Sequence, residues 1–145
     1  MKETALWDKL RPELAKLGKF QKIADKFTGG IPDVLGNHQG HGIAIELKEF
    51  KGTAANYWVR YRPGQVRWLR DWQEAGGTSW VASTVGTEVY LIPVQHIAKL
   101  ADGVNLPDLV KISSYIKGEE QWEHVALAIV RKSTLTYRGQ PRSSM

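Results

Sequence analysis

Three side chains that together could activate water lie close in the sequence: Asp33, Glu46 and Lys48. Glu46 and Lys48 end an alternating apolar segment, which predicts a strand over residues 42–48. Because strand side chains alternate between faces, Glu46 and Lys48 share one face, and a hairpin turn at residues 37–40 can bring Asp33 beside them. The spacing therefore predicts two carboxylates and one ammonium group at a single site.

Two carboxylates offer the hard oxygen ligands that Mg²⁺ prefers, and a backbone carbonyl, that of Leu47, would extend the set, with Mn²⁺ as a substitute. A cation held there would lower the pKa of a bound water and offset charge on a phosphodiester, while Lys48 orients the water or stabilises the transition state. This interpretation predicts metal-dependent phosphodiester hydrolysis. The alternative is that Glu46 and Lys48 form an ion pair on a solvated strand and that Asp33 lies in a turn.

The segments that must position these residues read as an α/β domain. Helices are predicted over residues 3–17, 65–75 and 94–101, and strands over residues 20–24, 33–35, 42–48, 80–83 and 88–92. Residues 49–63 read as a basic, aromatic loop, residues 106–115 are ambiguous, and residues 121–130 form a helix or a strand. This order predicts a mixed central β-sheet flanked by helices.

Composition bounds the class of protein. With 145 residues, 42% of them apolar and 24% charged, one domain over residues 1–130 is expected, with its core in residues 1–102. The absence of cysteine excludes disulfides and thiolate zinc sites, and a net charge of +5 favours a polyanionic partner. No apolar run reaches the roughly 20 residues of a membrane span, and no signal peptide is evident at residue 1, so a cytoplasmic protein is expected.

Four segments carry a family resemblance, and they occur in the family's order. They are Gly30–Val34, Ile45–Lys48, Arg62–Val66 and the glycine pair 76–77. Together they resemble the PD-(D/E)xK nuclease superfamily, and within it the small phage-encoded, virus-type replication-repair nucleases (VRR-NUC) and the Holliday-junction-resolvase-like endonucleases. The resemblance spans residues 1–100. It implies a restriction-endonuclease-like core and a nuclease that leaves 5′-phosphate and 3′-hydroxyl ends.

The resemblance also implies roles for individual residues. Asp33 and Glu46 would be metal ligands, Lys48 would be the catalytic lysine, and Gln65 would be a supporting polar residue near the lysine and the water. An acidic residue of the first helix often completes such sites.

Two residues of the first helix compete for that last role. Glu3 is favoured because it shares the helical stripe of Trp7 and Leu10, whereas Glu13 is closer in sequence to the hairpin. Either carboxylate would otherwise be a solvated helix side chain.

Positive charge and aromatic rings alternate after the predicted site. Such a segment could bind phosphates and stack on unpaired bases; its members are Lys51, Tyr57, Trp58, Arg60, Tyr61, Arg62, Arg67 and Arg70. The alternative is that Trp58 and Tyr61 pack on the sheet while the charges are solvated. Residues 131–145 form a basic tail, either a DNA-binding arm or a solubilising segment; its cations are Arg131, Lys132, Arg138 and Arg142.

DNA is the expected partner, and branched DNA such as a Holliday junction or a flap, in phage recombination, repair or replication, suits the resemblance. The rivals are a sequence-specific restriction-like endonuclease, a non-catalytic DNA-binding or packaging accessory protein with a nuclease fold, and a basic protein-interaction module. A homodimer would suit paired nicks, although the sequence does not establish one. His38 and His41 read as a surface hairpin rather than a zinc site, and no GxxxxGK[ST] segment for ATP is present.

Overall fold

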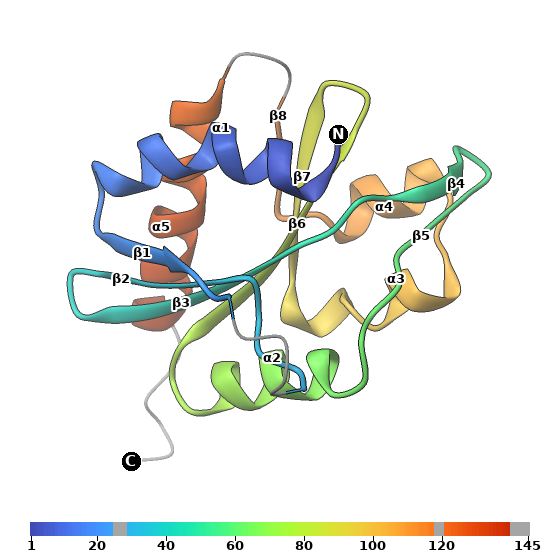
Figure 1. Ribbon diagram of the computed structural model, residues 1–145. Helices are drawn as coiled ribbons and strands as arrows, with labels where there is room; N and C mark the ends of the chain where they lie inside the picture. Colours follow the sequence, from blue (N-terminus) through green and yellow to red (C-terminus); the bar gives the residue numbers. More distant parts are fainter. Residues whose placement is uncertain (25–28, 118–120, 140–145) are drawn as a thin grey trace.

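A six-stranded sheet forms the centre of the computed structural model, which describes residues 1–24, 29–117 and 121–139 (Figure 1). Its order is β1-β2-β3-β6-β7-β8, and only the β3–β6 pair is parallel among these neighbours. The strands are β1 (Lys19–Lys22), β2 (Val34–His38), β3 (His41–Leu47), β6 (Thr78–Val85), β7 (Glu88–Pro93) and β8 (Tyr115–Lys117). The predicted mixed sheet is therefore confirmed.

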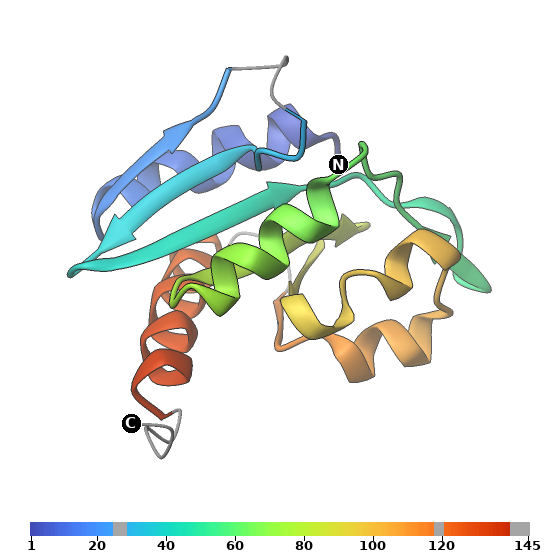
Figure 2. The same ribbon diagram turned by 90° about the horizontal axis from the view of Figure 1, so that it is seen from below.

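Helices cover both faces of this sheet (Figure 2). One face carries α1 (Glu3–Ala15) and α5 (Trp122–Gly139); the other carries α2 (Gln65–Glu74), η1 (Val94–His96), α3 (Lys99–Asp102) and α4 (Leu106–Ile112). Because β3 is buried on both faces, Ile43 and Ile45 pack with α1 and α5 while Ala44 packs with α2. No helix in these described ranges is long and apolar enough to cross a membrane.

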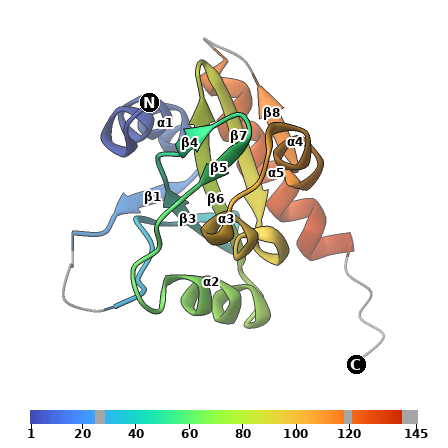
Figure 3. The same cartoon turned by 90° about the vertical axis from the view of Figure 1, so that its right-hand side faces the viewer.

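The connection from β3 to β6 contains more structure than the sequence predicted. Parallel strands require a crossover, and here it includes α2 and a small hairpin of β4 (Lys51–Thr53) and β5 (Asn56–Trp58) within the predicted loop 49–63. The hairpin lies beside α3 and α4 (Figure 3). The Tyr57 and Val104 backbones exchange hydrogen bonds of 2.7 and 2.8 Å, which join β5 to the segment between these two helices. The crossover thus carries the chain from the end of β3 past the hairpin to the start of α2.

The C-terminal half resolves the segments that were ambiguous. Residues 106–112 form α4, whose first turn is capped by the Asn105 side chain accepting from the Asp108 N–H at 2.9 Å. Helix α5 continues through residues 131–139 of the segment expected as a basic tail, and residues 140–145, with Arg142, lie outside the described residues.

Two glycines bring the approach to Asp33 against the start of α2. Gly30 and Gly64 both have positive φ angles, of 88° and 85°, which glycine adopts without strain. A Cβ at Gly30 would lie 2.6 Å from the Gly64 carbonyl oxygen, so the two backbones are in direct contact. This contact joins the segment before β2 to the N-terminal end of α2.

Candidate active site

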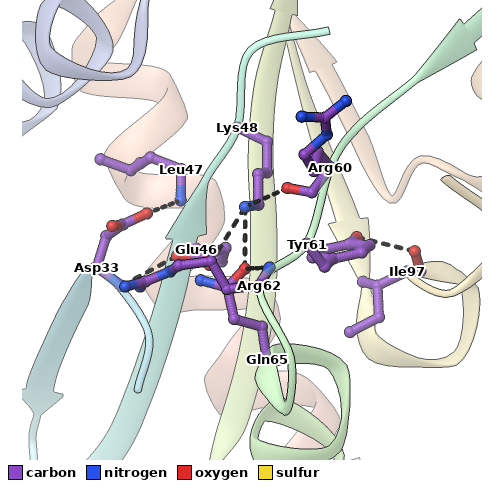
Figure 4. Close-up of polar contacts among 9 residues, drawn as sticks. All are labelled: Asp33, Glu46, Leu47, Lys48, Arg60, Tyr61, Arg62, Gln65 and Ile97. Carbon is purple, nitrogen blue, oxygen red and sulfur yellow. Dashed lines mark hydrogen bonds and ion pairs between the residues drawn. The ribbon is translucent and has the colours of Figure 1, made fainter. Parts of the chain in front are cut away.

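The sheet and the crossover bring Asp33, Glu46, Lys48 and Gln65 together (Figure 4). We call these four residues the catalytic cluster. Val34 pairs with Ile45 across the β2–β3 hairpin, which places Asp33, just before β2, beside Glu46. Lys48 directly follows β3, and Gln65 is the first residue of α2.

Main-chain hydrogen bonds fix the two carboxylates. The Asp33 N–H donates to Glu46 Oε1 at 3.1 Å, and the Leu47 N–H donates to Asp33 Oδ2 at 2.8 Å. Glu46 is therefore bound by the backbone of Asp33, and Asp33 is bound by the backbone of the residue after Glu46. The register of the β2–β3 hairpin sets the separation of the two carboxylates. This is the pairing that the sequence spacing predicted.

Glu46 lies in an unusual environment for a carboxyl group. Its side chain is 1% exposed, and its Oε2 atom has no hydrogen-bond partner among the residues that the structure describes. Burial, followed by the neighbouring Asp33 carboxylate, raises the pKa of Glu46 to about 9. These effects outweigh the Lys48 ammonium 3.7 Å from Oε2, which lowers the pKa. These surroundings favour the protonated form of Glu46 over the ionised form.

Lys48 is held on several sides. Its Nζ donates to the Arg60 carbonyl at 2.7 Å and to Gln65 Oε1 at 3.0 Å, and it lies 5.2 Å from the centre of the Tyr61 ring. Gln65, 1% exposed, also accepts from the Arg62 N–H at 2.8 Å. The amide of Gln65 thus links the lysine to the segment that precedes α2.

Glu3 lies closer to this cluster than Glu13. Glu3 lines a pocket together with Asp33, Leu47 and Glu49, and partial burial with the charge of Asp33 raises its pKa. Glu13 instead pairs with the exposed Lys16 at 3.0 Å. Glu3 lies on the helical stripe of buried residues, but it is the first residue of α1 and remains exposed. It therefore borders the pocket from the N-terminal end of that helix.

Glu49 was not among the predicted site residues. It lines the same pocket as Glu3, and its charge contributes to the raised pKa of Glu3. The strand alternation that paired Glu46 with Lys48 also places Leu47 and Glu49 on the opposite side of the chain. That signal could have identified Glu49 as a neighbour of the first helix.

The donor set fits a hard divalent cation. The described part of the chain contains no group of three or more His, Cys, Asp or Glu side chains arranged for a metal. The available donors are the carboxylates of Asp33 and Glu46, and the Oε2 atom of Glu46 is buried without a partner among the described residues. A main-chain oxygen of Leu47, a residue that lines the pocket, would extend the set. Mg²⁺ commonly binds one or two carboxylates and keeps several waters, so this set suits it.

The two histidines of the β2–β3 hairpin bond to separate partners. His38 Nδ1 lies 2.6 Å from the Leu17 carbonyl, and His41 Nε2 lies 2.7 Å from Thr78 Oγ1. These contacts tie the hairpin to its neighbours in the fold. His38 is half-buried and His41 is buried, so the expected surface position is wrong for His41.

The cations predicted to bind DNA are exposed. We call Lys51, Arg60, Arg62, Arg67 and Arg70 the basic surface. Its three arginines at positions 62, 67 and 70 line a second pocket along α2, which also contains Asp71 and Glu74.

The aromatic residues of the same segment have different environments. Tyr57 packs on Phe50, with ring centres 5.6 Å apart. Tyr61 is half-buried, packs against the apolar cluster on the α2 face of the sheet, and donates its hydroxyl to the Ile97 carbonyl at 2.8 Å. For Tyr61, packing on the sheet is therefore the correct interpretation. Trp58 is half-buried and belongs to neither apolar cluster.

The sheet order and the flanking helices define a restriction-endonuclease-like fold. No protein-family model and no curated protein matches this chain. Among solved structures, the Holliday junction resolvase Hjc of Archaeoglobus fulgidus is 18% identical, with 85% of this chain and 98% of that chain covered and a TM-score of 0.56. The bacterial homing endonuclease I-Ssp6803I is 12% identical, with 96% of each chain covered and a TM-score of 0.55. At these identities the likeness establishes the fold, and the predicted fold class is confirmed.

Proposed function

We propose that this protein is a metal-dependent endonuclease that hydrolyses phosphodiester bonds in DNA, with branched DNA such as a Holliday junction or a flap as its preferred substrate. The observation that carries the proposal is Glu46 Oε2, which is buried without a hydrogen bond between Asp33 and Lys48. An ionised carboxylate in such a place is costly unless a cation accompanies it. A divalent cation bound by both carboxylates would supply that charge.

The residues of the cluster would divide the chemistry among them. Asp33, Glu46 and the main-chain oxygen of Leu47 would hold Mg²⁺ or Mn²⁺, which when bound would lower the pKa of a water and offset charge on the phosphate. The Lys48 ammonium, held by the Arg60 carbonyl and Gln65, would orient the attacking water or stabilise the negative charge of the transition state. Cleavage would leave 5′-phosphate and 3′-hydroxyl ends.

Two observations support branched DNA as the proposed substrate. The basic surface continues from the cluster along α2, where exposed arginines would contact phosphates without reading sequence. One protein with the same fold is a Holliday junction resolvase. A role in phage recombination, repair or replication is supported by the sequence resemblance alone.

A sequence-specific endonuclease is the second candidate. The homing endonuclease I-Ssp6803I matches the fold about as well as the resolvase does, with TM-scores of 0.55 and 0.56. The two candidates share the catalytic cluster and differ in the DNA that they select.

The deciding experiment is cleavage of labelled four-way junction, flap, single-stranded and linear duplex DNA, each with Mg²⁺, Mn²⁺ or a chelator. Wild type is compared with Glu46→Ala and with Glu123→Ala, a control that removes an exposed carboxylate from the first turn of α5. We expect metal-dependent cutting of the branched substrates, loss of cutting in Glu46→Ala, and wild-type cutting in Glu123→Ala.

The other outcomes are informative as well. Wild type that binds these DNAs without cutting any of them would favour a non-catalytic accessory protein. Cutting confined to one sequence in linear duplex would favour the second candidate. Full activity in Glu46→Ala would mean that the active site lies elsewhere.

A further inference from the structure

The tripeptide Arg60–Arg62, which we call the clasp, presents different groups on its two sides. The side chains of Arg60 and Arg62 are exposed. Tyr61 between them is turned inward, packs in the apolar cluster on the α2 face of the sheet, and donates its hydroxyl to the Ile97 carbonyl at 2.8 Å (Figure 4). Burial raises the pKa of Tyr61, so its phenol remains a donor at neutral pH.

Every residue of the clasp is connected to Lys48 on the inner side. The Arg60 carbonyl accepts from the lysine Nζ at 2.7 Å, and the Tyr61 ring centre lies 5.2 Å from the same atom. The Arg62 N–H donates to Gln65 Oε1, which accepts from Nζ at 3.0 Å. The position of one ammonium group therefore depends on where the backbone of the clasp lies.

The Tyr61 ring lies within cation–π range of the Lys48 ammonium, 5.2 Å from its centre. An ammonium has three N–H donors, and the Arg60 carbonyl and Gln65 Oε1 take two of them, while Glu46 Oε2 lies farther away at 3.7 Å. A cation within about 6 Å of an aromatic centre is attracted to the ring face. The ring thus adds an attraction that needs no further donor from the lysine.

We propose that Tyr61 is a positioning residue for Lys48. Its ring, anchored through the hydroxyl at Ile97, keeps the clasp over the lysine and the ammonium beside the two carboxylates. The arginines on the outer side of the same clasp contact substrate phosphates. The catalytic consequence rests on the proposed nuclease function, whereas the positioning of Lys48 can be measured without any cleavage.

The first measurement is the rate at which an amine-selective acylating reagent modifies Lys48 in the metal-free protein, read by mass spectrometry relative to the exposed Lys51. Lys48 is 8% exposed, so it is expected to react slowly in wild type. Tyr61→Leu is expected to raise the Lys48 to Lys51 ratio at least about fivefold, because the lysine opens to solvent locally when its support is removed. Tyr61→Phe keeps the ring but loses the hydrogen bond to Ile97, so its ratio is expected to lie between those of wild type and Tyr61→Leu.

A matched variant separates positioning from a general loss of packing. Tyr90 is 2% exposed and belongs to the same apolar cluster, but its hydroxyl bonds to Glu88 rather than near Lys48. Tyr90→Leu is expected to lower stability without changing the acylation ratio. If Tyr61→Leu does not fold, Tyr61→Met offers a side chain of similar length without a ring face.

The second measurement uses the DNA that wild type cuts. Tyr61→Leu is expected to lower kcat about tenfold while KM stays within about twofold, because the ring acts on the lysine and not on the substrate. Arg60→Ala is expected to do the reverse, raising KM with no change in Lys48 acylation. Acylation and kcat that respond equally to Tyr61→Leu and Tyr90→Leu, or that do not respond to Tyr61→Leu, would overturn the proposal. If wild type cuts no DNA, the nuclease function fails, and the acylation ratio still decides whether Tyr61 positions Lys48.

Discussion

The catalytic cluster and the basic surface differ in how firmly the fold determines them. In the cluster, Asp33 and Lys48 each make polar contacts of 2.7–3.1 Å to the main chain or to a buried side chain. On the basic surface, the contact between Arg67 and Asp71 is 3.9 Å long and largely exposed. The difference would suit the two tasks proposed for these regions, because bond cleavage requires fixed atoms whereas phosphate binding requires mainly charge.

The largest effect is expected when a lysine of the catalytic cluster is replaced and the result is compared with replacement of a lysine on the basic surface. Lys48→Ala should lower the single-turnover cleavage rate by roughly 10²–10³, as expected for the loss of one fixed charge at a developing oxyanion. Lys51→Ala, which removes an exposed lysine of β4, should change the rate by no more than about threefold and act mainly on binding. Equal losses in both variants would remove the distinction between the two regions.

A second prediction concerns the pH dependence of stability in the metal-free protein. The folded-state pKa of Glu46, about 9, exceeds its ordinary value of 4.5, so between these values the folded state binds more protons than the unfolded state. The stability contributed by this group is complete below pH 4.5 and is lost as the pH rises toward 9. The Glu46→Gln variant cannot ionise at this position, so it avoids the loss of stability at high pH. Its free energy of unfolding, measured by urea denaturation at pH 8 with chelator, should be about 1–3 kcal/mol larger than that of wild type.

Divalent cation provides the control for that prediction. Mg²⁺ should raise the thermal midpoint of wild type at pH 8 and have little effect on Glu46→Gln, because a ligand stabilises the state that binds it. A Glu46→Gln variant that is less stable than wild type at pH 8 without metal would show that Glu46 is ionised and satisfied there.

The smallest expected effects lie on α2. Arg67→Ala and Arg70→Ala should each reduce the slope of log binding constant against log salt by about one, equally for junction and duplex DNA. The thermal midpoint should shift by no more than about 2 °C for Arg67→Ala, because its ion pair with Asp71 is exposed. An unchanged slope for both variants would place the DNA on another face.

Short-range sequence patterns were enough to predict that Asp33, Glu46 and Lys48 lie together. Strand alternation placed Glu46 and Lys48 on one face, and the hairpin turn placed Asp33 beside them, because both depend on neighbours within one hairpin. Gln65 came from the resemblance rather than from spacing, since its contact with Lys48 spans 17 residues and requires the crossover.

Features that depend on distant segments were missed. The hairpin β4–β5 has few apolar residues and was predicted as a loop, because the sequence gives no sign that Tyr57 would pair with Val104. For Tyr61 the sequence left stacking on bases and packing on the sheet as alternatives, and the contact that distinguishes them is with Ile97, 36 residues away. Alternating charge and aromatic rings do not distinguish a side chain that packs inward from one that meets a ligand.

The contact between Gly30 and Gly64 acts as a spacer between the two halves of the catalytic cluster. Gly30 leads into the strand that carries Asp33, and Gly64 leads into the helix that begins with Gln65, and a Cβ on Gly30 would lie 2.6 Å from the other backbone. The segments that lead to Asp33 and to Gln65 therefore meet where Gly30 has room for a hydrogen atom but not for a methyl group. A side chain at Gly30 would push the segment of Asp33 away from the helix that begins with Gln65.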